Sequence, residues 1–376
     1  MRVIWSIIKK DTRLMLREPF YIGISIILPI MFYIFFTIIT SGSATVPIAI
    51  VDDAQNANSR EFIALFSEKI DNKRDLEASY WEIVSTNTKE SMSLFSNREV
   101  MSMVIIPENF DKNSKVIMKT HNINSDYTKN FQLRLDEIIN YYNHNKLDFN
   151  NQISVKEKSW VQKDIPMLTY MASSLLVFAF LYGGMVNTGV LIAREWEEDT
   201  VKELLLSPVS KIHLVIGKML SGLVPTFISG GIIYLIIYLV QGFKPTGNLL
   251  LILLLVLITA FLGVGIGVLI GSLTKRILPT IQINIIIAVV SLIIGGGFSP
   301  LDGLAWGGVS QYVYYFSKIL PPYYAFKAGH LIMNTEFLDN FFLYLIIVLG
   351  SSLIIISLAS LYLSKGLKQA PRPKVY

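Results

Sequence analysis

The sequence predicts a polytopic α-helical membrane protein with six transmembrane helices and an extracellular α/β (α+β) domain between helices 1 and 2. Three observations support this fold class. Of 376 residues, 52% are hydrophobic and only 16% are charged, whereas about a quarter of the residues of a typical soluble domain are charged. The charges are unevenly spread and leave six long runs without Asp, Glu, Lys or Arg. One long polar segment separates the first run from the second.

Each of the six uncharged runs is long enough to cross a membrane, which takes about 20 apolar residues. The runs cover residues 20–40, 165–193, 219–243, 245–274, 277–301 and 340–364. The fourth run opens with the turn-like sequence PTGN, so we expect its helix to start near Leu249. The sequence therefore predicts transmembrane helix 1 at 20–40 and helices 2 to 6 within 165–364.

The positions of Lys and Arg predict the orientation of these helices. Basic residues are concentrated before the first run, after the second, after the fourth and after the last. The other short loops contain only Lys244, Lys318 and Lys327. Because Lys and Arg collect on the cytoplasmic side, we expect cytoplasmic N- and C-termini, including a tail at 365–376. The net charge of +5 reflects this bias, and we expect no nucleic-acid partner.

Residues 1–19 are predicted to form a cytoplasmic amphipathic helix. Ile4, Ile7, Ile8 and Met15 share one face and basic residues share the other, although Asp11 falls on the apolar side. A helix of this kind typically lies along an anionic membrane surface, which would make membrane lipids a partner. An ordinary basic flank of the first span is the alternative. The first run is too long for a cleavable signal and lacks an obvious cleavage site, so we expect it to remain as an anchor.

Residues 44–163 form the large polar segment. The strand-like stretches VPIAIVDD, YWEIVST, VMSMVII and SKVIMKT alternate with helical patterns, one of which begins with a cap made by Asn87 and Glu90. Phe131, Leu135 and their neighbours then line a longer helix. Alternating strands and helices over roughly 120 residues are typical of a small α/β or α+β domain. Long domains are translocated regardless of charge, so we expect this one outside.

The sequence shows no arrangement typical of catalysis. The absence of cysteine excludes disulfides, zinc–thiolate sites and cysteine nucleophiles. The four histidines have no metal-binding spacing, and neither a phosphate-binding loop nor a nucleophile elbow is present. No uncharged run offers an intramembrane ion pair or a charged proton relay. We therefore predict that the chain is not an enzyme and binds no metal or cofactor itself.

Two sets of residues within the spans favour either a pathway or helix packing. Three glycines in the fourth run are four residues apart and share one helix face: Gly263, Gly267 and Gly271. This spacing favours close contact between helices. Three polar residues stand out in the spans: Asn187, Gln282 and Asn284. They either line a pathway or form hydrogen bonds between helices.

Residues 298–339 form an unusually aromatic segment that also contains Pro321 and Pro322. Its length and composition predict short helices at the outer membrane interface, or a re-entrant segment that dips into it. An aromatic belt is one interpretation, because Trp and Tyr are enriched at the interfaces of a bilayer. An outer gate is the other.

The densest acidic cluster lies in the loop at 194–213, which follows the second run. Its five acidic residues are Glu195, Glu197, Glu198, Asp199 and Glu203. Thr200 and Glu203 have the spacing of a capping box, and Pro208 disfavours helical geometry at the preceding residue. The loop is therefore predicted to contain a short helix that begins near Thr200, with anions at its N-terminus. The helix either rests its leucines on the membrane or docks a cytoplasmic partner.

The stretch REWEEDTVKELLLSPVSKIHLVIGK resembles the signature of ABC-2 type exporter permeases, in which an acidic stretch leads into Thr, Glu-Leu, Pro-Val-Ser and a later Gly-Lys. The matching positions are Glu195, Glu198, Thr200, Glu203, Leu204, Pro208, Val209, Ser210, Gly217 and Lys218. The family usually has Gly immediately before the Thr, where this chain has Asp199. The leader, the inserted domain and the aromatic segment also resemble family members with large outer domains, including the linearmycin-resistance type.

The resemblance implies a permease subunit of an ATP-driven exporter in a bacterial cell membrane. Such a subunit forms a homodimer, or a heterodimer with a paralogous permease, and docks on a separate ABC ATPase subunit that holds ATP and Mg²⁺. The loop at 194–213, with Glu197 beside the matched positions, would be the coupling element. The cargo would be lipophilic or amphipathic, such as a drug, an antibiotic or a lipid. The alternative is a membrane-anchored receptor, sensor or phage-receptor-like accessory protein whose extracellular domain binds a ligand.

Overall fold

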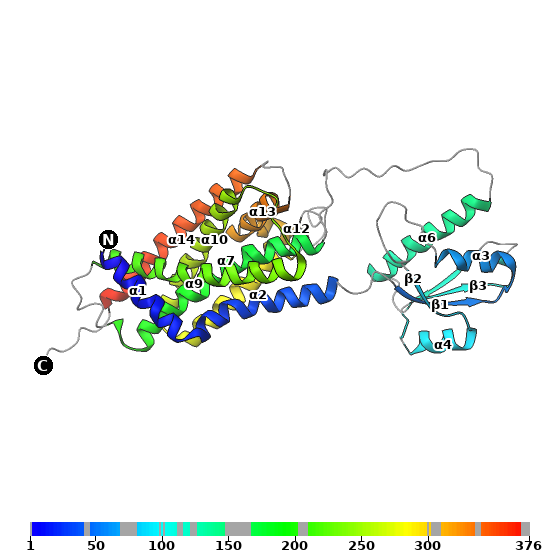
Figure 1. The fold of residues 1–376 in the computed structure, drawn as a ribbon, viewed down its shortest axis with the longest axis horizontal. Helices are drawn as coiled ribbons and strands as arrows, with labels where there is room; N and C mark the ends of the chain where they lie inside the picture. The colour runs from blue at the N-terminus through cyan, green and yellow to red at the C-terminus, as the bar shows by residue number, and fades with distance from the viewer. Residues whose placement is uncertain are drawn as a thin grey trace. The chain divides into compact units, whose positions relative to one another are not determined.

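The chain divides into two compact units, each of which is described by itself. One unit comprises Met1–Thr40 and Ser159–Tyr376, and the other comprises Ser41–Lys158. A computed structural model (Figure 1) describes residues 2–40, 46–67, 81–97, 99–100, 102–110, 116–120, 126–146, 167–201, 210–298, 301, 310–334 and 340–369.

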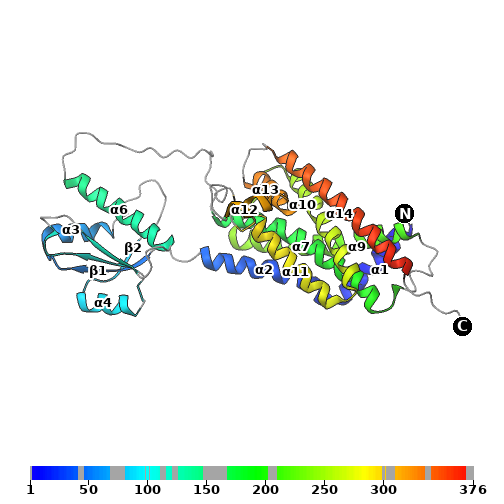
Figure 2. The same cartoon turned by 180° about the vertical axis from the view of Figure 1, so that it is seen from behind.

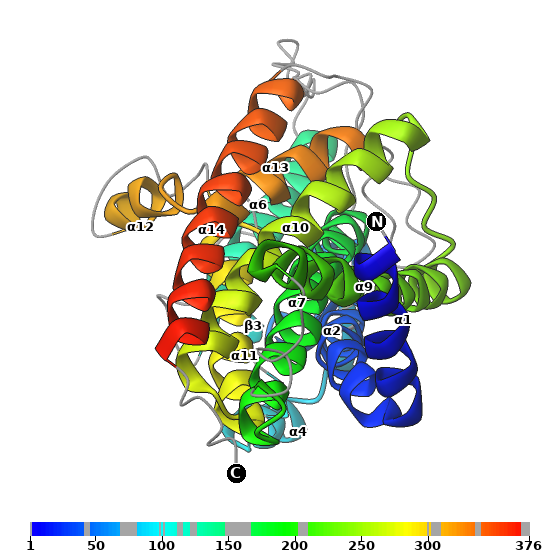
Figure 3. The same ribbon diagram turned by 90° about the vertical axis from the view of Figure 1, so that its left-hand side faces the viewer.

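Six helices in the described part of the chain are long and apolar enough to cross a membrane, which confirms the predicted number of spans. They are α2 (Pro19–Thr40), α7 (Met167–Glu197), α9 (Lys211–Gln241), α10 (Leu249–Thr274), α11 (Ile277–Ile294) and α14 (Phe341–Gln369). The apolar stretch of α7 is entirely buried, whereas only 22% of those of α2 and α14 is buried. The helix α7 is therefore the centre of this unit, and Figure 3 shows it among α2, α9, α10 and α11.

Several helix ends differ from the ends of the uncharged runs. The helix α7 continues through charged residues to Glu197, and α9 begins at Lys211 within the loop that precedes the third run. By contrast, α11 ends at Ile294, before a left-handed Gly296 with φ 79°. The helix α10 begins at Leu249, as predicted. The ends of the uncharged runs do not predict the ends of α7 and α9, because charged residues inside these helices pair with other parts of the protein. Glu195 of α7 and Lys218 of α9, for example, pair with each other.

The helix α10 packs against α7 through the glycine face that the sequence indicates. A Cβ atom at any of the three positions would collide with a backbone carbonyl oxygen of α7. The three glycines are Gly263, Gly267 and Gly271. Only a residue without a side chain permits this approach of two backbones. These three glycines therefore lie at the contact between α10 and α7.

The helix α1 (Arg2–Arg17) lies on the bundle, mainly against α9. Met15 is buried beside Ile22 and Leu191, and Asp11 is also buried. The predicted apolar face thus contacts protein, and the contact of α1 with a lipid surface stays a prediction.

Two short helices lie within the aromatic segment: α12 (Ser310–Ser317) and α13 (Pro321–Asn334). The helix α13 packs against α7, α10 and α14, and buries Tyr323 and Phe326. In contrast, the side chain of Tyr312 in α12 is 76% exposed. The predicted short helices are present, whereas their position at the outer interface stays a prediction.

The second unit contains a four-stranded sheet in the order β2-β1-β3-β4. The strand β1 (Val46–Asp52) runs parallel to β2 (Trp81–Ser85) and β3 (Ser102–Ile106), and β4 (Ile117–Thr120) is antiparallel to β3. Pairing of β1 with two parallel neighbours needs crossover connections, which the intervening helices supply.

Helices cover both faces of this sheet (Figures 1 and 2). The helices α3 (Ala57–Leu65) and α6 (Asp126–Lys146) pack on one face around Phe62 and Phe131. The helix α4 (Thr88–Ser96) covers the other face, and the Asn87 side chain caps it by accepting hydrogen bonds from the amides of Lys89 and Glu90. The predicted α/β fold is present, while its extracellular placement stays a prediction.

Candidate functional site

A buried lysine joins three helices at the end of α7 where the acidic stretch lies. The Nζ atom of Lys218 in α9 lies 2.9 Å from Asp11 Oδ1 in α1 and 2.5 Å from Glu195 Oε1 in α7. Lys10 Nζ approaches the same Glu195 oxygen at 3.1 Å. Only 1% of Lys218 and 1% of Asp11 is exposed. The two ammonium and two carboxylate charges cancel, which is what permits burial of an ionised group.

The glycine before Lys218 explains how α1 comes this close. A Cβ atom at Gly217 would lie 2.9 Å from the side chain of Ile7 in α1. The absence of a side chain therefore lets α1 settle onto α9, and the next residue carries the charge that meets Asp11. The Gly-Lys pair thus combines a close approach of two helices with an ion pair between them.

The neighbouring Arg194 binds the connection between α1 and α2. Its two terminal nitrogens donate to the two carboxylate oxygens of Glu18 at 2.8 and 2.7 Å. Its Nε atom donates to Glu198 Oε1 at 2.7 Å. This paired geometry is the strongest form of an arginine–carboxylate contact. The side chains of Glu18 and Glu198 are 42% and 44% exposed. Solvent therefore screens both ion pairs, which lowers their contribution to stability.

Two further residues of the stretch contact the turn between α10 and α11. Glu197 Oε2 accepts a hydrogen bond of 2.6 Å from the amide of Ile277, the first residue of α11. The side chain of Arg276, the N-cap residue, forms no cap hydrogen bond. Glu197 therefore caps α11 from another helix, where a carboxylate is favoured by the helix dipole. The ammonium group of Lys275 lies 4.4 Å from the centre of the Trp196 ring.

The chain turns directly after α7. Asp199 is left-handed, with φ 59°, a conformation that glycine adopts readily and that Asp tolerates better than most residues. The Thr200 hydroxyl donates to the Glu195 carboxylate, and Val201 is helical and buried. The predicted capping box also requires the Thr200 hydroxyl to accept a hydrogen bond from the amide of Glu203. Glu203 lies outside the described part of the chain. The same applies to Leu204, Pro208 and Val209, so the short helix stays a prediction.

We refer to these residues as the α7 network: Lys10, Asp11, Glu18, Arg194, Glu195, Trp196, Glu197, Glu198, Thr200, Lys218, Lys275 and the amide of Ile277. It connects α7 with α1, the α1–α2 connection, α9 and the α10–α11 turn. Its contacts are ion pairs, hydrogen bonds and one contact of an ammonium group with a ring, and they resemble no nucleophile–base arrangement. Most of them join the end of α7 to other elements.

The polar residues predicted within the spans occupy different positions. Asn187 Nδ2 donates to Thr226 Oγ1 at 3.3 Å, and Asn284 Nδ2 donates to the carbonyl oxygen of Met185 at 3.2 Å. Both asparagines are buried, and each of these hydrogen bonds joins two helices. Gln282 lies on an exposed face of α11, away from these contacts.

A second polar cluster, which the sequence does not single out, surrounds His330 in α13. Its Nδ1 atom lies 2.9 Å from Ser173 Oγ, and its Nε2 atom lies 3.1 Å from Ser174 Oγ. The ring of Tyr170 stacks on the imidazole at 3.7 Å between centres. Burial, followed by the charge of Lys327, lowers the pKa of His330 to about 3. The imidazole is therefore neutral at neutral pH, and the cluster fixes α13 on α7.

Among the described residues, no group of His, Asp and Glu side chains is placed to hold a metal ion. In the described part of the helical unit, polar side chains gather at the α7 network and at the His330 cluster. The sequence did carry a signal for the His330 cluster: two adjacent serines in an apolar run, and a histidine four residues before Asn334. In the structure, Asn334 Nδ2 donates to Ser173 Oγ at 2.8 Å.

Comparison with known proteins gives matches at the level of family and of distant relatives. A family model described as "ABC-2 family transporter protein" matches residues 19–361. The chain is also similar to the probable multidrug ABC transporter permease YbhR of Escherichia coli strain K12 and of strain O157:H7. Each is 23% identical over 237 residues, which cover 59% of this chain and 61% of the relative. No solved structure matches the chain significantly.

Proposed function

Because this chain belongs to the ABC-2 family of transporter proteins, we propose that it is the membrane-spanning permease subunit of an ATP-driven exporter. It would form the translocation pathway for a lipophilic or amphipathic molecule and couple to a separate ATPase subunit. Two observations support the nature of the cargo. The six helices are strongly apolar, and the relatives carry the description of multidrug permeases.

The observation that carries the coupling proposal is the convergence of several elements on the end of α7, directly before the segment 202–209. Contact of that segment with an ATPase would shift the end of α7. Glu195 would carry the shift to α9 and α1, Arg194 to the α1–α2 connection and Glu197 to α11. Removing one partner of a buried ion pair typically costs about 3–5 kcal/mol, so the buried pair of Glu195 with Lys218 would hold α7 and α9 together during a displacement.

This mechanism divides the coupling residues into two groups. Glu195, Thr200, Gly217 and Lys218 act inside the subunit, because their described contacts are with its own helices. We propose that the other group meets the ATPase: Glu203, Leu204, Pro208 and Val209, together with Glu198, whose side chain pairs with Arg194 but stays 44% exposed. In this proposal ATP and Mg²⁺ are held by the partner subunit, and this chain supplies no catalytic residue.

The orientation and the assembly belong to the same proposal. The end of α7 that carries the acidic stretch would face the cytoplasm together with both termini, and the α/β unit would lie outside. Two permease subunits, identical or paralogous, would enclose the pathway. The excess of Lys and Arg on the side of the acidic stretch supports this orientation.

The decisive experiment is reconstitution of the tagged chain with an ABC ATPase subunit from the same organism. We expect the two proteins to copurify in mild detergent and to extrude a fluorescent lipophilic cation from liposomes when Mg²⁺ and ATP are supplied. Replacement of ATP by a non-hydrolysable analogue should stop extrusion. Purified chain that transports without any ATPase, or that never associates with one, would contradict the proposal.

A further inference from the structure

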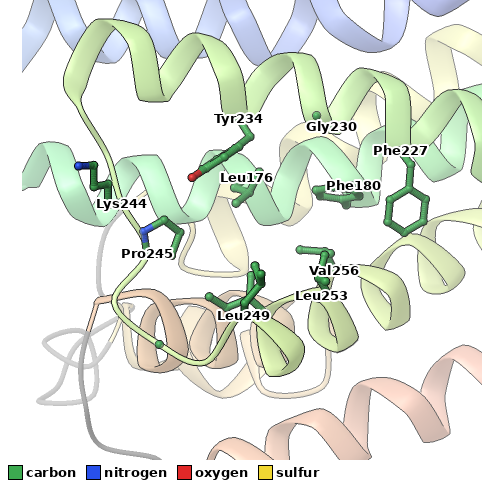
Figure 4. Close-up of a pocket in the computed structure, with 13 residues that line it drawn as sticks. Leu176, Phe180, Phe227, Gly230, Tyr234, Lys244, Pro245, Leu249, Leu253 and Val256 are labelled. Atoms are coloured by element: carbon green, nitrogen blue, oxygen red, sulfur yellow. The ribbon is translucent and has the colours of Figure 1, made fainter.

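An apolar pocket of about 400 Å³ lies between α7, α9 and α10, away from the α7 network. Figure 4 shows its walls: Leu176 and Phe180 come from α7, Phe227 and Tyr234 from α9, and Val256 from α10. A volume of this size is within the range that holds a small molecule or part of a lipid.

The pocket opens on the side of the bundle that the surrounding bilayer contacts. Leu249 and Leu253 in its wall are 69% and 49% exposed. Further along α9 than the lining residue Tyr234, Leu235 and Leu239 are 53% and 70% exposed. Since these helices cross the membrane, hydrocarbon chains are the material that meets this surface. An acyl chain can therefore enter the pocket sideways, without crossing water.

One end of the pocket carries a single positive charge. Lys244 and Pro245 lie there, in the connection between α9 and α10, and Phe227 lies toward the other end (Figure 4). Lys244 is exposed, and no acidic side chain pairs with it among the residues that the structure describes. A flexible lysine at the end of a membrane helix suits a phosphate group at the level of the lipid headgroups.

The connection that carries Lys244 is held in place by α13. The amide and hydroxyl of Thr246 both donate to the carbonyl oxygen of Met333, at 3.0 and 3.1 Å. A Cβ atom at Gly247 would collide with the carbonyl oxygen of Ile332. The backbone of the connection that carries Lys244 is therefore preformed, which lowers the entropic cost of binding.

We propose that this pocket binds an anionic phospholipid of the bilayer, with one acyl chain between α9 and α10 and the phosphate group beside Lys244. Apart from the Tyr234 hydroxyl and Lys244, the side chains of the wall are apolar. Recognition thus depends on net negative charge rather than on the identity of the headgroup. The lipid would stabilise the α9–α10 connection, and its binding requires no ATPase, so it is independent of the transport proposal.

A glycine in the wall offers a way to fill the pocket. A Cβ atom at Gly231 meets no other atom within 4 Å, so Gly231→Leu should extend into the space without a collision. Gly350 in α14 has the same open surroundings but lies outside the pocket wall, and Gly350→Leu is the matched control. Lys244→Gln removes the charge, and Lys318→Gln is the control for loss of a lysine from another loop.

The test uses full-length protein in phosphatidylcholine nanodiscs that contain a trace of photoreactive lipid with a diazirine near the end of one acyl chain. We expect a phosphatidylglycerol probe to label residues 227–256 roughly fivefold more than a phosphatidylcholine probe, the effect of about one lysine near an anionic lipid. Lys244→Gln should abolish this preference. Gly231→Leu should reduce labelling by both probes, and neither control should change it.

Several outcomes would overturn the proposal: equal labelling of residues 227–256 by both probes, preference for phosphatidylglycerol that survives Lys244→Gln, or protection of these residues by a second copy of the chain. The elution profile and melting temperature show whether Gly231→Leu is folded. If that variant fails to fold, Lys244→Gln decides the question alone, because it changes an exposed side chain in a connection that Thr246 anchors.

Discussion

The ammonium group of Lys218 lies 2.9 Å from the carboxylate of Asp11, although 207 positions separate the two residues in the chain. This contact fixes α1 on α9 and leaves the second carboxylate of the site, Glu195, to connect both helices to α7. Asp11 on an otherwise apolar helix face therefore joins α1 to the bundle through an ion pair. The contact also predicts which substitutions in the α7 network should reduce stability most.

Replacing Lys218 with methionine should strongly destabilise the protein, because it leaves the Asp11 and Glu195 carboxylates buried without their shared partner. Loss of one partner of a buried pair costs about 3–5 kcal/mol. Asp11→Asn should cost less, since Lys218 keeps Glu195. The melting temperature in detergent measures both effects. Lys9→Met, which changes an exposed lysine, is the control, and an equal shift in Lys9→Met and Lys218→Met would contradict the assignment.

The contact between Gly217 and Ile7 predicts a non-additive pair of substitutions. Gly217→Ala should push α1 away, because the new methyl group would lie 2.9 Å from the Ile7 side chain. Ile7→Ala removes the two nearest atoms and leaves only its Cβ, at 3.1 Å from the new methyl group, at the cost of apolar contact. We expect the double variant to be more stable than the sum of the two single effects indicates, by about 0.5–3 kcal/mol. Additive melting shifts would show that the two residues do not oppose each other.

Stability should fall in mild acid because of His330. Its pKa is about 3 in the folded protein and about 6.5 in an unfolded chain, so the unfolded state binds the proton more readily. The contribution of His330 to the free energy of unfolding is complete above pH 6.5. It declines by about 1.4 kcal/mol per pH unit as the pH falls from 6.5 toward 3. Melting curves of the native protein and of His330→Gln between pH 7.5 and 4.5 test this, since the variant should lose that part of the slope.

Charge reversal tests the part of the acidic stretch that we assign to the ATPase contact. Glu198→Lys combined with Glu203→Lys should reduce ATP-dependent transport at least tenfold, on the order of 1.4 kcal/mol of coupling free energy, and leave membrane insertion intact. The control is Glu82→Lys with Glu108→Lys, two exposed positions in the α/β unit. Unchanged export by the first variant, at equal amounts of protein in the membrane, would remove the docking role.

Periodicity and composition predict those features of the fold that depend on neighbours in the chain. The six spans, the glycine face at Gly263 and the strands around β1 follow from local patterns of apolar and small residues. The partner of Asp11 does not, because no local pattern specifies a lysine in another helix. For the same reason Lys218 is counted as a loop residue by a rule that treats every charge as the end of a span.

The His330 cluster shows the same limit from the polar side. Ser173 and Ser174 interrupt an apolar run only slightly, and their partner lies 157 and 156 positions away. A histidine without a second ligand nearby in the chain suggests neither a metal nor a base. Only the packing of α13 against α7 brings its two ring nitrogens to the two hydroxyls.

The left-handed turn at Asp199 gives a final prediction, one that concerns the residue in which this chain departs from the family signature. A residue with a side chain at φ 59° pays about 1–2 kcal/mol relative to right-handed geometry, a cost that glycine avoids. Asp199→Gly should therefore raise the melting temperature or leave it unchanged, while Asp199→Val should lower it, because a β-branched residue fits this conformation poorly.

If the turn also positions the segment after α7 for the ATPase, Asp199→Gly should retain ATP-dependent transport and Asp199→Val should lose it at equal protein level. Equal stability of the two variants would show that this position is not left-handed in the folded protein.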